Sequence, residues 1–170
     1  YKESDLDHIS TLGFRGEALY SISSVSQVEL VTRPRGQVEG VRIGLNNHVL
    51  VSKSFAGIDY GTTISVSELF SQFPARKKFF KSESAEGSRI HSMIQKFAIC
   101  NPGVAFELNQ GSSRSFRTSG SGVLRDVMVA IFGISEASKM IEIAEEYDQD
   151  WQGPVVSGII GTPDQKRSNR

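Results

Sequence analysis

The sequence has almost no cysteine and no long apolar run, and each shortage excludes a class of protein. Cys100 is the single cysteine among 170 residues, so an intramolecular disulfide is impossible and one thiol alone cannot make a metal site. This favours a reducing compartment. No apolar run approaches the roughly 20 residues of a membrane span, and no signal-peptide pattern opens the chain. We therefore expect no membrane partner.

The sequence also lacks a net charge, because 19 basic and 19 acidic residues balance. No overall field therefore attracts nucleic acid. The charges are unevenly distributed, however, and between Glu68 and Glu83 all four charged residues are basic. These residues are Arg76, Lys77, Lys78 and Lys81. The sequence also opens in mid-pattern without a methionine, so we expect it to be a fragment.

What the sequence does contain is a glycine turn that leads into a helical pattern. Gly13 and Gly16 are three residues apart, and Ala18, Leu19 and Ile22 then recur at helical spacing. Glycine lets the backbone adopt positive φ and approach a bulky ligand, and a helix N-terminus offers unpaired N–H groups to an anion. The pattern predicts a phosphate-binding loop, but a tight structural connection has the same spacing.

The rest of the first half predicts strands and a short basic helix. A helix over 17–24 is followed by strands at 27–33, 38–45 and 48–55, expected as an antiparallel meander, and by a strand at 62–66. Pro74 is suited to the first position of a helix. If that helix covers 74–81, its lysines share neighbouring faces and Phe79 and Phe80 turn partly inward.

The second half predicts more helices and strands, with a boundary between two domains. A long helix is expected to be capped by Ser84 or Ser88 and to end at Asn101, Pro102 and Gly103, before strands at 104–108 and 114–118. A helix along 124–131 should end at Gly133, ahead of strands at 139–144 and 155–160. The glycine- and serine-rich segment 119–122 is the best linker by composition, so we place the domain boundary there.

Two strings resemble a known family. The string Gly13-Phe14-Arg15-Gly16-Glu17-Ala18-Leu19 resembles the signature of the MutL family of DNA mismatch repair proteins, which belong to the GHKL ATPases. Residues 61–70, followed by 73–79, resemble the next motif of the family, in the right order. The resemblance implies an α+β fold. Residues 1–118 would be the C-terminal part of a GHKL α/β sandwich with a mixed sheet, and residues 119–170 the start of a ribosomal protein S5 domain 2-like domain.

The resemblance also implies an ATP site. The residues expected beside the phosphates are Gly13, Phe14, Arg15, Gly16, Glu17, Ala18 and Leu19. Thr62 would help to bind adenine, although an ordinary strand threonine is the alternative. We expect Glu17 to accept N–H groups at the helix start or to pair with a base. Arg15 would contact phosphate or form a structural salt bridge.

The residues that complete catalysis in the family lie outside this sequence. The general-base glutamate, the Mg²⁺-binding asparagine and an adenine motif would lie upstream, and a lysine that completes the site downstream. We assign no catalytic residue and no metal ligand within the 170 residues. Without a general base and a metal ligand, the segment alone is expected not to hydrolyse ATP.

The resemblance implies DNA as a further partner. The residues expected to contact its phosphates, independently of sequence, are Arg76, Lys77, Lys78 and Lys81. A solvated helix face is the alternative. The whole protein would form a nucleotide-dependent homodimer and couple a MutS-type mismatch recognition protein to a downstream helicase or endonuclease. It would be cytoplasmic and nucleoid-associated in a bacterium, or nuclear in a eukaryote. Two other readings stay open: another GHKL ATPase, Hsp90-like or topoisomerase-like, and a DNA-binding module without ATP.

Overall fold

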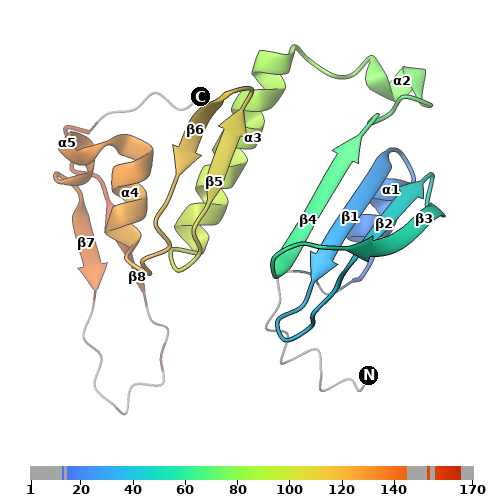
Figure 1. Ribbon diagram of the computed structural model, residues 1–170. Coiled ribbons are helices and arrows are strands. Elements are labelled where there is room, and N and C mark those ends of the chain that lie inside the picture. Colours follow the sequence, from blue (N-terminus) through green and yellow to red (C-terminus); the bar gives the residue numbers. More distant parts are fainter. Residues whose placement is uncertain (1–12, 14, 145–152, 154–155, 166–170) are drawn as a thin grey trace. The chain divides into compact units, whose positions relative to one another are not determined.

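The chain forms two compact units in the structure, which is a computed structural model that describes residues 13, 15–144, 153 and 156–165. Unit 1 comprises residues 1–80 and unit 2 residues 81–170 (Figure 1). This division concerns contacts within the chain. The boundary between family domains expected after residue 118 stays a prediction.

Unit 1 is an antiparallel sheet with one short helix against it. Its elements are α1 (Ala18–Ser23), β1 (Gln27–Arg33), β2 (Gly40–Asn46), β3 (Val49–Ala56), β4 (Gly61–Ser67) and α2 (Pro74–Lys77). The strand order is β3-β2-β1-β4, and α1 lies against one face of the sheet (Figure 1). The expected meander β1-β2-β3 is confirmed. All the pairings between these strands are antiparallel, so the expectation of a mixed sheet is wrong for this part of the chain.

The two faces of the sheet in unit 1 differ in polarity. The register places Leu30 opposite Ile43 on β2 and Ile64 on β4, so one face is apolar. The other face carries Glu29 and Arg42, whose charged groups are 2.7 Å apart. Because strand side chains alternate between the two faces, Thr32 and Thr62 lie on the apolar face, at its end.

The expected basic helix is much shorter than the sequence indicated. Pro74 does occupy the first turn of α2, as predicted, but the helix ends after Lys77, with Lys78 as its C-cap. Phe79 is then 85% exposed, so the expectation that it turns inward is wrong. Phe80 packs its ring 5.6 Å from that of Phe70. The chain is extended again at Ser82, the N-cap of the next helix.

Unit 2 contains two hairpins and three helices among its described residues. Its elements are α3 (Glu83–Cys100), β5 (Glu107–Gln110), β6 (Ser113–Arg117), α4 (Leu124–Phe132), α5 (Ile134–Ala137), β7 (Ile141–Ala144) and β8 (Ser157–Ile160). The expected pair of strands is present as β5 and β6, but β5 begins three residues later than predicted. The strands expected at 139–144 and 155–160 are present as β7 and β8, which pair with each other, and α4 ends at Gly133 as predicted. None of the described helices combines the length and apolar character needed to cross a bilayer.

The core of unit 2 lies between α3, α4 and the β5-β6 hairpin. Ala98, Phe116 and Val127 are buried together, one from each of these elements. The partly buried residues packed against them are Ile94, Ile99, Phe106, Leu108 and Ile131. This cluster attaches the hairpin to both helices.

The long helix α3 begins earlier than predicted. Ser82 is its N-cap, with an extended backbone, and its hydroxyl accepts a hydrogen bond from the amide of Ala85. The expectation of a cap at Ser84 or Ser88 is wrong, because both lie inside the helix. The helix ends at Asn101, as predicted.

Candidate functional site

The glycine turn of unit 1 borders an open cavity of about 500 Å³. The residues that line it come from one continuous stretch before and within the start of α1. They are Gly13, Arg15, Gly16, Glu17, Ala18, Leu19 and Ser21. Six of the seven residues predicted to lie beside a phosphate therefore meet in one cavity, and Phe14 lies outside the described residues. Ser21 is an addition, which the helical spacing from Glu17 could have indicated.

The backbone at this cavity is shaped by glycine. Gly16 has φ +68°, a conformation that residues with a side chain adopt at a cost. No atom of the residues that the structure describes lies within 4 Å of where a Cβ on Gly16 would be, so the requirement for glycine is conformational. The turn therefore leaves room at the backbone for an incoming group.

The start of α1 offers amide groups to that space. Glu17 is the N-cap, but its side chain makes no capping hydrogen bond. It also forms no ion pair with another residue that the structure describes. Neither structural role expected for Glu17 is therefore observed. The first-turn amides of α1 have no acceptors within the helix and remain available to a ligand.

Thr62 lies elsewhere in unit 1, on β4. It does not line the glycine cavity. Its hydroxyl oxygen is 2.8 Å from that of Thr32, the residue opposite it on β1. Sequence reasoning missed Thr32, because nothing local to it indicates that β1 pairs with β4.

The basic residues predicted to bind DNA are divided between two segments. Arg76 stacks over two aromatic rings, with its guanidinium carbon 5.3 Å from the ring centre of Phe73 and 5.9 Å from that of Phe70. Lys77 and Lys78 are exposed at the end of α2 and form no salt bridge to any described residue. Lys81 belongs to unit 2. The single helical face expected for the lysines is therefore not formed.

No metal-binding cluster is found at either place. Among residues 13, 15–144, 153 and 156–165, no three His, Cys, Asp or Glu side chains are grouped so that they could hold a metal ion.

Curated proteins align with nearly the whole chain, although no family model matches it. The DNA mismatch repair protein MutL of Limosilactobacillus reuteri (strain DSM 20016) is 40% identical over 166 residues, which are 98% of this chain and 24% of that protein. MutL of Desulforudis audaxviator is also 40% identical over 166 residues, 98% of this chain and 29% of that protein. MutL of Streptococcus mutans is 38% identical over 169 residues, 99% of this chain and 25% of that protein. The chain spans about a quarter of the length of these relatives.

Solved structures of similar fold come from the same group of proteins. The Aquifex aeolicus MutL ATPase domain complexed with ADP matches with a TM-score of 0.68 and 29% identity, over 84% of this chain and 55% of that one. The ATPase domain from the bacterial mismatch repair endonuclease Aquifex aeolicus MutL matches with a TM-score of 0.63 and 27% identity, over 87% of this chain and 53% of that one. Sequence and fold agree, and the chain belongs to the MutL family of DNA mismatch repair proteins, with the α+β fold of their GHKL ATPase domain.

Proposed function

We propose that this chain supplies the phosphate loop and the adenine-side strand of a MutL protein that binds ATP with Mg²⁺ and hydrolyses it slowly during DNA mismatch repair. The glycine-lined cavity at the start of α1 is the observation that carries the proposal. A relative of 29% identity is described as an ATPase domain complexed with ADP, which supports nucleotide binding by the same fold.

The residues at the cavity suit a phosphate group. Gly16 leaves the backbone of the turn uncovered by a side chain, and the amides at the start of α1 can donate to an anion. Arg15 brings a positive charge to the lining. ATP supplies the reactive phosphoanhydride, and the residues of this chain bind and orient its phosphates. Thr62, away from the cavity on β4, would contact the base.

Replacing Gly16 by alanine should weaken ATP binding by the full-length protein about tenfold. A Cβ at φ +68° strains the turn and shifts the amides that would contact phosphate, and small displacements in such a loop are costly. Fluorescence titration with an ATP analogue measures the change.

Gly36→Ala is the matched control for this experiment. Gly36 has φ +85° in the turn between β1 and β2, and among the described residues no atom lies within 4 Å of its Cβ position, so the strain is similar but the cavity is untouched. Equal nucleotide affinities of the two variants would contradict the phosphate role of the turn. Absence of ATP binding by the unmodified full-length protein would favour the alternative of a DNA-binding module without ATP.

We further propose that the basic residues Arg76, Lys77, Lys78 and Lys81 contact DNA phosphates. Support comes from the exposure of Lys77 and Lys78 and from their lack of acidic partners among the described residues. Stacking on Phe70 and Phe73 holds Arg76 in place beside them.

Lys78→Glu should weaken DNA binding about three- to tenfold, equally for all sequences, and should make the affinity less dependent on salt. The reason is the loss of one phosphate contact and its released counterion. Fluorescence anisotropy with two unrelated duplexes at several salt concentrations measures both effects. Lys53→Glu on β3 makes the same charge change at another exposed site of unit 1. The same loss with Lys53→Glu would show a general charge effect and contradict the assignment.

The wider role of the protein follows from the family. We propose that nucleotide binding closes a homodimer and that this state couples a MutS-type recognition protein to a downstream helicase or endonuclease. We also propose that the GHKL part ends near residue 118 and that an S5 domain 2-like domain starts at residue 119. In a bacterium the protein would act in the cytoplasm at the nucleoid.

A further inference from the structure

The hydroxyl of Thr62 lies within a short chain of hydrogen bonds between β1 and β4. Thr32 and Thr62 face each other in the antiparallel register, and their Oγ1 atoms are 2.8 Å apart. The Thr32 hydroxyl also lies 3.3 Å from the carbonyl oxygen of Gly61, to which it can donate. The Thr32 hydroxyl therefore contacts both the carbonyl of Gly61 and the hydroxyl of Thr62, the residue proposed to contact the base.

The number of hydroxyl protons decides which threonine donates in each of these hydrogen bonds. Each threonine hydroxyl carries one proton, and the carbonyl of Gly61 can accept but cannot donate. Both contacts are satisfied when Thr32 donates to Gly61 and Thr62 donates to Thr32. In this arrangement the single proton of Thr62 is already used. Its oxygen then has lone pairs for a ligand but no proton to give.

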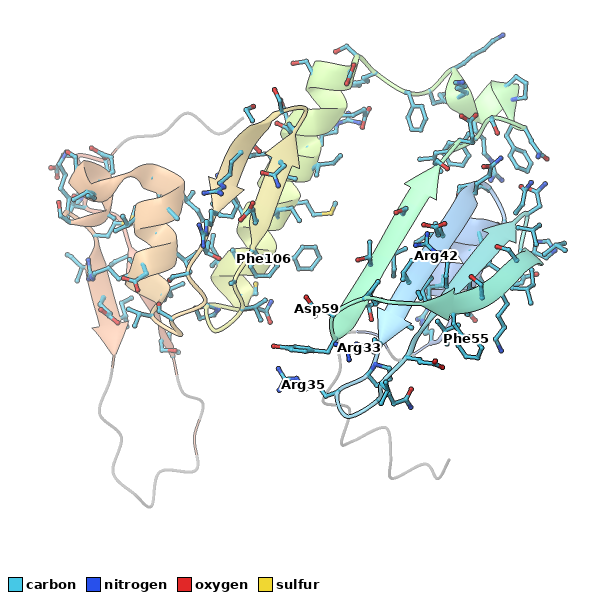
Figure 2. All side chains as sticks on the ribbon, viewed as in Figure 1. Arg33, Arg35, Arg42, Phe55, Asp59 and Phe106 are labelled. Atoms are coloured by element: carbon cyan, nitrogen blue, oxygen red, sulfur yellow. The ribbon has the colours of Figure 1, made fainter. Side chains whose placement is uncertain are left out.

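A second, solvent-exposed contact lies at the same ends of the two strands. Arg33, next to Thr32, extends its guanidinium to the carboxylate of Asp59 at 3.8 Å and donates to the carbonyl of Gln37 at 3.1 Å. Arg33 and Asp59 lie together where β1 ends and β4 begins (Figure 2). Both threonines are β-branched, which further restricts their side-chain rotamers.

We propose that Thr32 is a positioning and specificity-determining residue, which accepts a hydrogen bond from the Thr62 hydroxyl and so leaves the Thr62 oxygen as an acceptor for an amino group on the bound base. A purine with a 6-amino group is then favoured over one with a 6-oxo group, because the oxo oxygen can only accept. This inference rests on the proposed nucleotide site. It adds a residue that acts through Thr62 rather than on the nucleotide itself.

The test compares ATP with inosine triphosphate, which carries oxygen in place of the 6-amino group. Binding of both nucleotides to the full-length protein is measured by calorimetry for wild type, Thr32→Val, Thr32→Ser and Thr62→Val. We expect wild type to bind ATP at least about tenfold more tightly than inosine triphosphate. Thr32→Val and Thr62→Val should each lower this ratio about three- to tenfold, and Thr32→Ser should retain it because it keeps the hydroxyl.

Thr63→Val is the matched control. Thr63 follows Thr62 on β4 but faces the opposite side of the sheet, so loss of its hydroxyl should leave the ratio unchanged. If Thr32→Val does not fold, as judged by circular dichroism, Thr32→Ala takes its place.

The results distinguish the role of Thr32 from the nucleotide site itself. If Thr32 were merely structural, Thr32→Val would weaken the binding of both nucleotides equally. An unchanged ratio of ATP affinity to inosine triphosphate affinity in Thr32→Val would therefore overturn the proposal. A wild type that binds both nucleotides equally well would also overturn it, while leaving the nucleotide site intact. A wild type that binds neither nucleotide would instead refute the proposed function.

Discussion

Replacing Phe116 by alanine is expected to lower the free energy of unfolding by about 3 to 4 kcal/mol. Phe116 on β6 is 5% exposed and is the largest of the three residues that are buried together in unit 2. Its ring also makes an edge contact with His91 on α3, with the ring centres 5.7 Å apart. Truncation removes this packing and leaves a cavity between α3, α4 and the hairpin.

Urea unfolding followed by circular dichroism measures the effect. Phe79→Ala is the matched control, because the side chain of Phe79 is 85% exposed and its loss should change stability by less than about 0.5 kcal/mol. If the two variants were equally stable, Phe116 could not be the centre of the core of unit 2.

Replacing Gly120 by alanine is expected to lower the free energy of unfolding by about 2 to 4 kcal/mol. Gly120 has φ +70°, and a Cβ on it would lie 2.6 Å from the backbone nitrogen of Ala105. The substitution therefore adds backbone strain to a clash with main-chain atoms that cannot move aside as a side chain can. Thermal unfolding of the variant and of wild type measures the loss.

The variant Gly122→Ala separates backbone strain from the clash with main-chain atoms. Gly122 lies two residues after Gly120 in the same connection between β6 and α4. It also has positive φ, at +83°, but a Cβ there would meet no atom of the described part of the chain within 4 Å. Gly122→Ala should therefore cost only the strain, about 1 to 2 kcal/mol. Equal losses for both variants would mean that the close approach of Gly120 to Ala105 contributes nothing.

The elements that the sequence predicted well are those with local signals. β1 was expected at residues 27–33 and has these bounds, because alternation and flanking turn residues define it. α4 ends at Gly133, where glycine adopts φ +82°. The glycine turn and the start of α1 were likewise recognisable, since the spacing of two glycines before an apolar helix is contained within ten residues.

The elements that the sequence predicted poorly depend on contacts between distant residues or on competing caps. Pro74 correctly marked a helix start, but nothing nearby indicated that α2 would end after Lys77. Ser82, and not Ser84, is the N-cap of α3. With Ser82 as the cap, the acidic residues Glu83 and Glu86 both lie in the first turn of the helix, where negative charge is stabilising. The partner of Thr62 was missed for the same kind of reason, since pairing of β1 with β4 is not a local property.

The position of β4 at the edge of the sheet has a consequence for the order in which unit 1 assembles. β1, β2 and β3 follow one another and pair as neighbours, whereas the connection after β3 returns across the sheet, so that β4 pairs with β1 at the opposite edge. The meander needs only short loop closures, but the addition of β4 closes a loop that contains two complete strands, which is slower. We therefore expect the strand that carries Thr62 to join last. In the folded protein β4 pairs only with β1, so opening of that one pairing would release Thr62 while the meander stays intact.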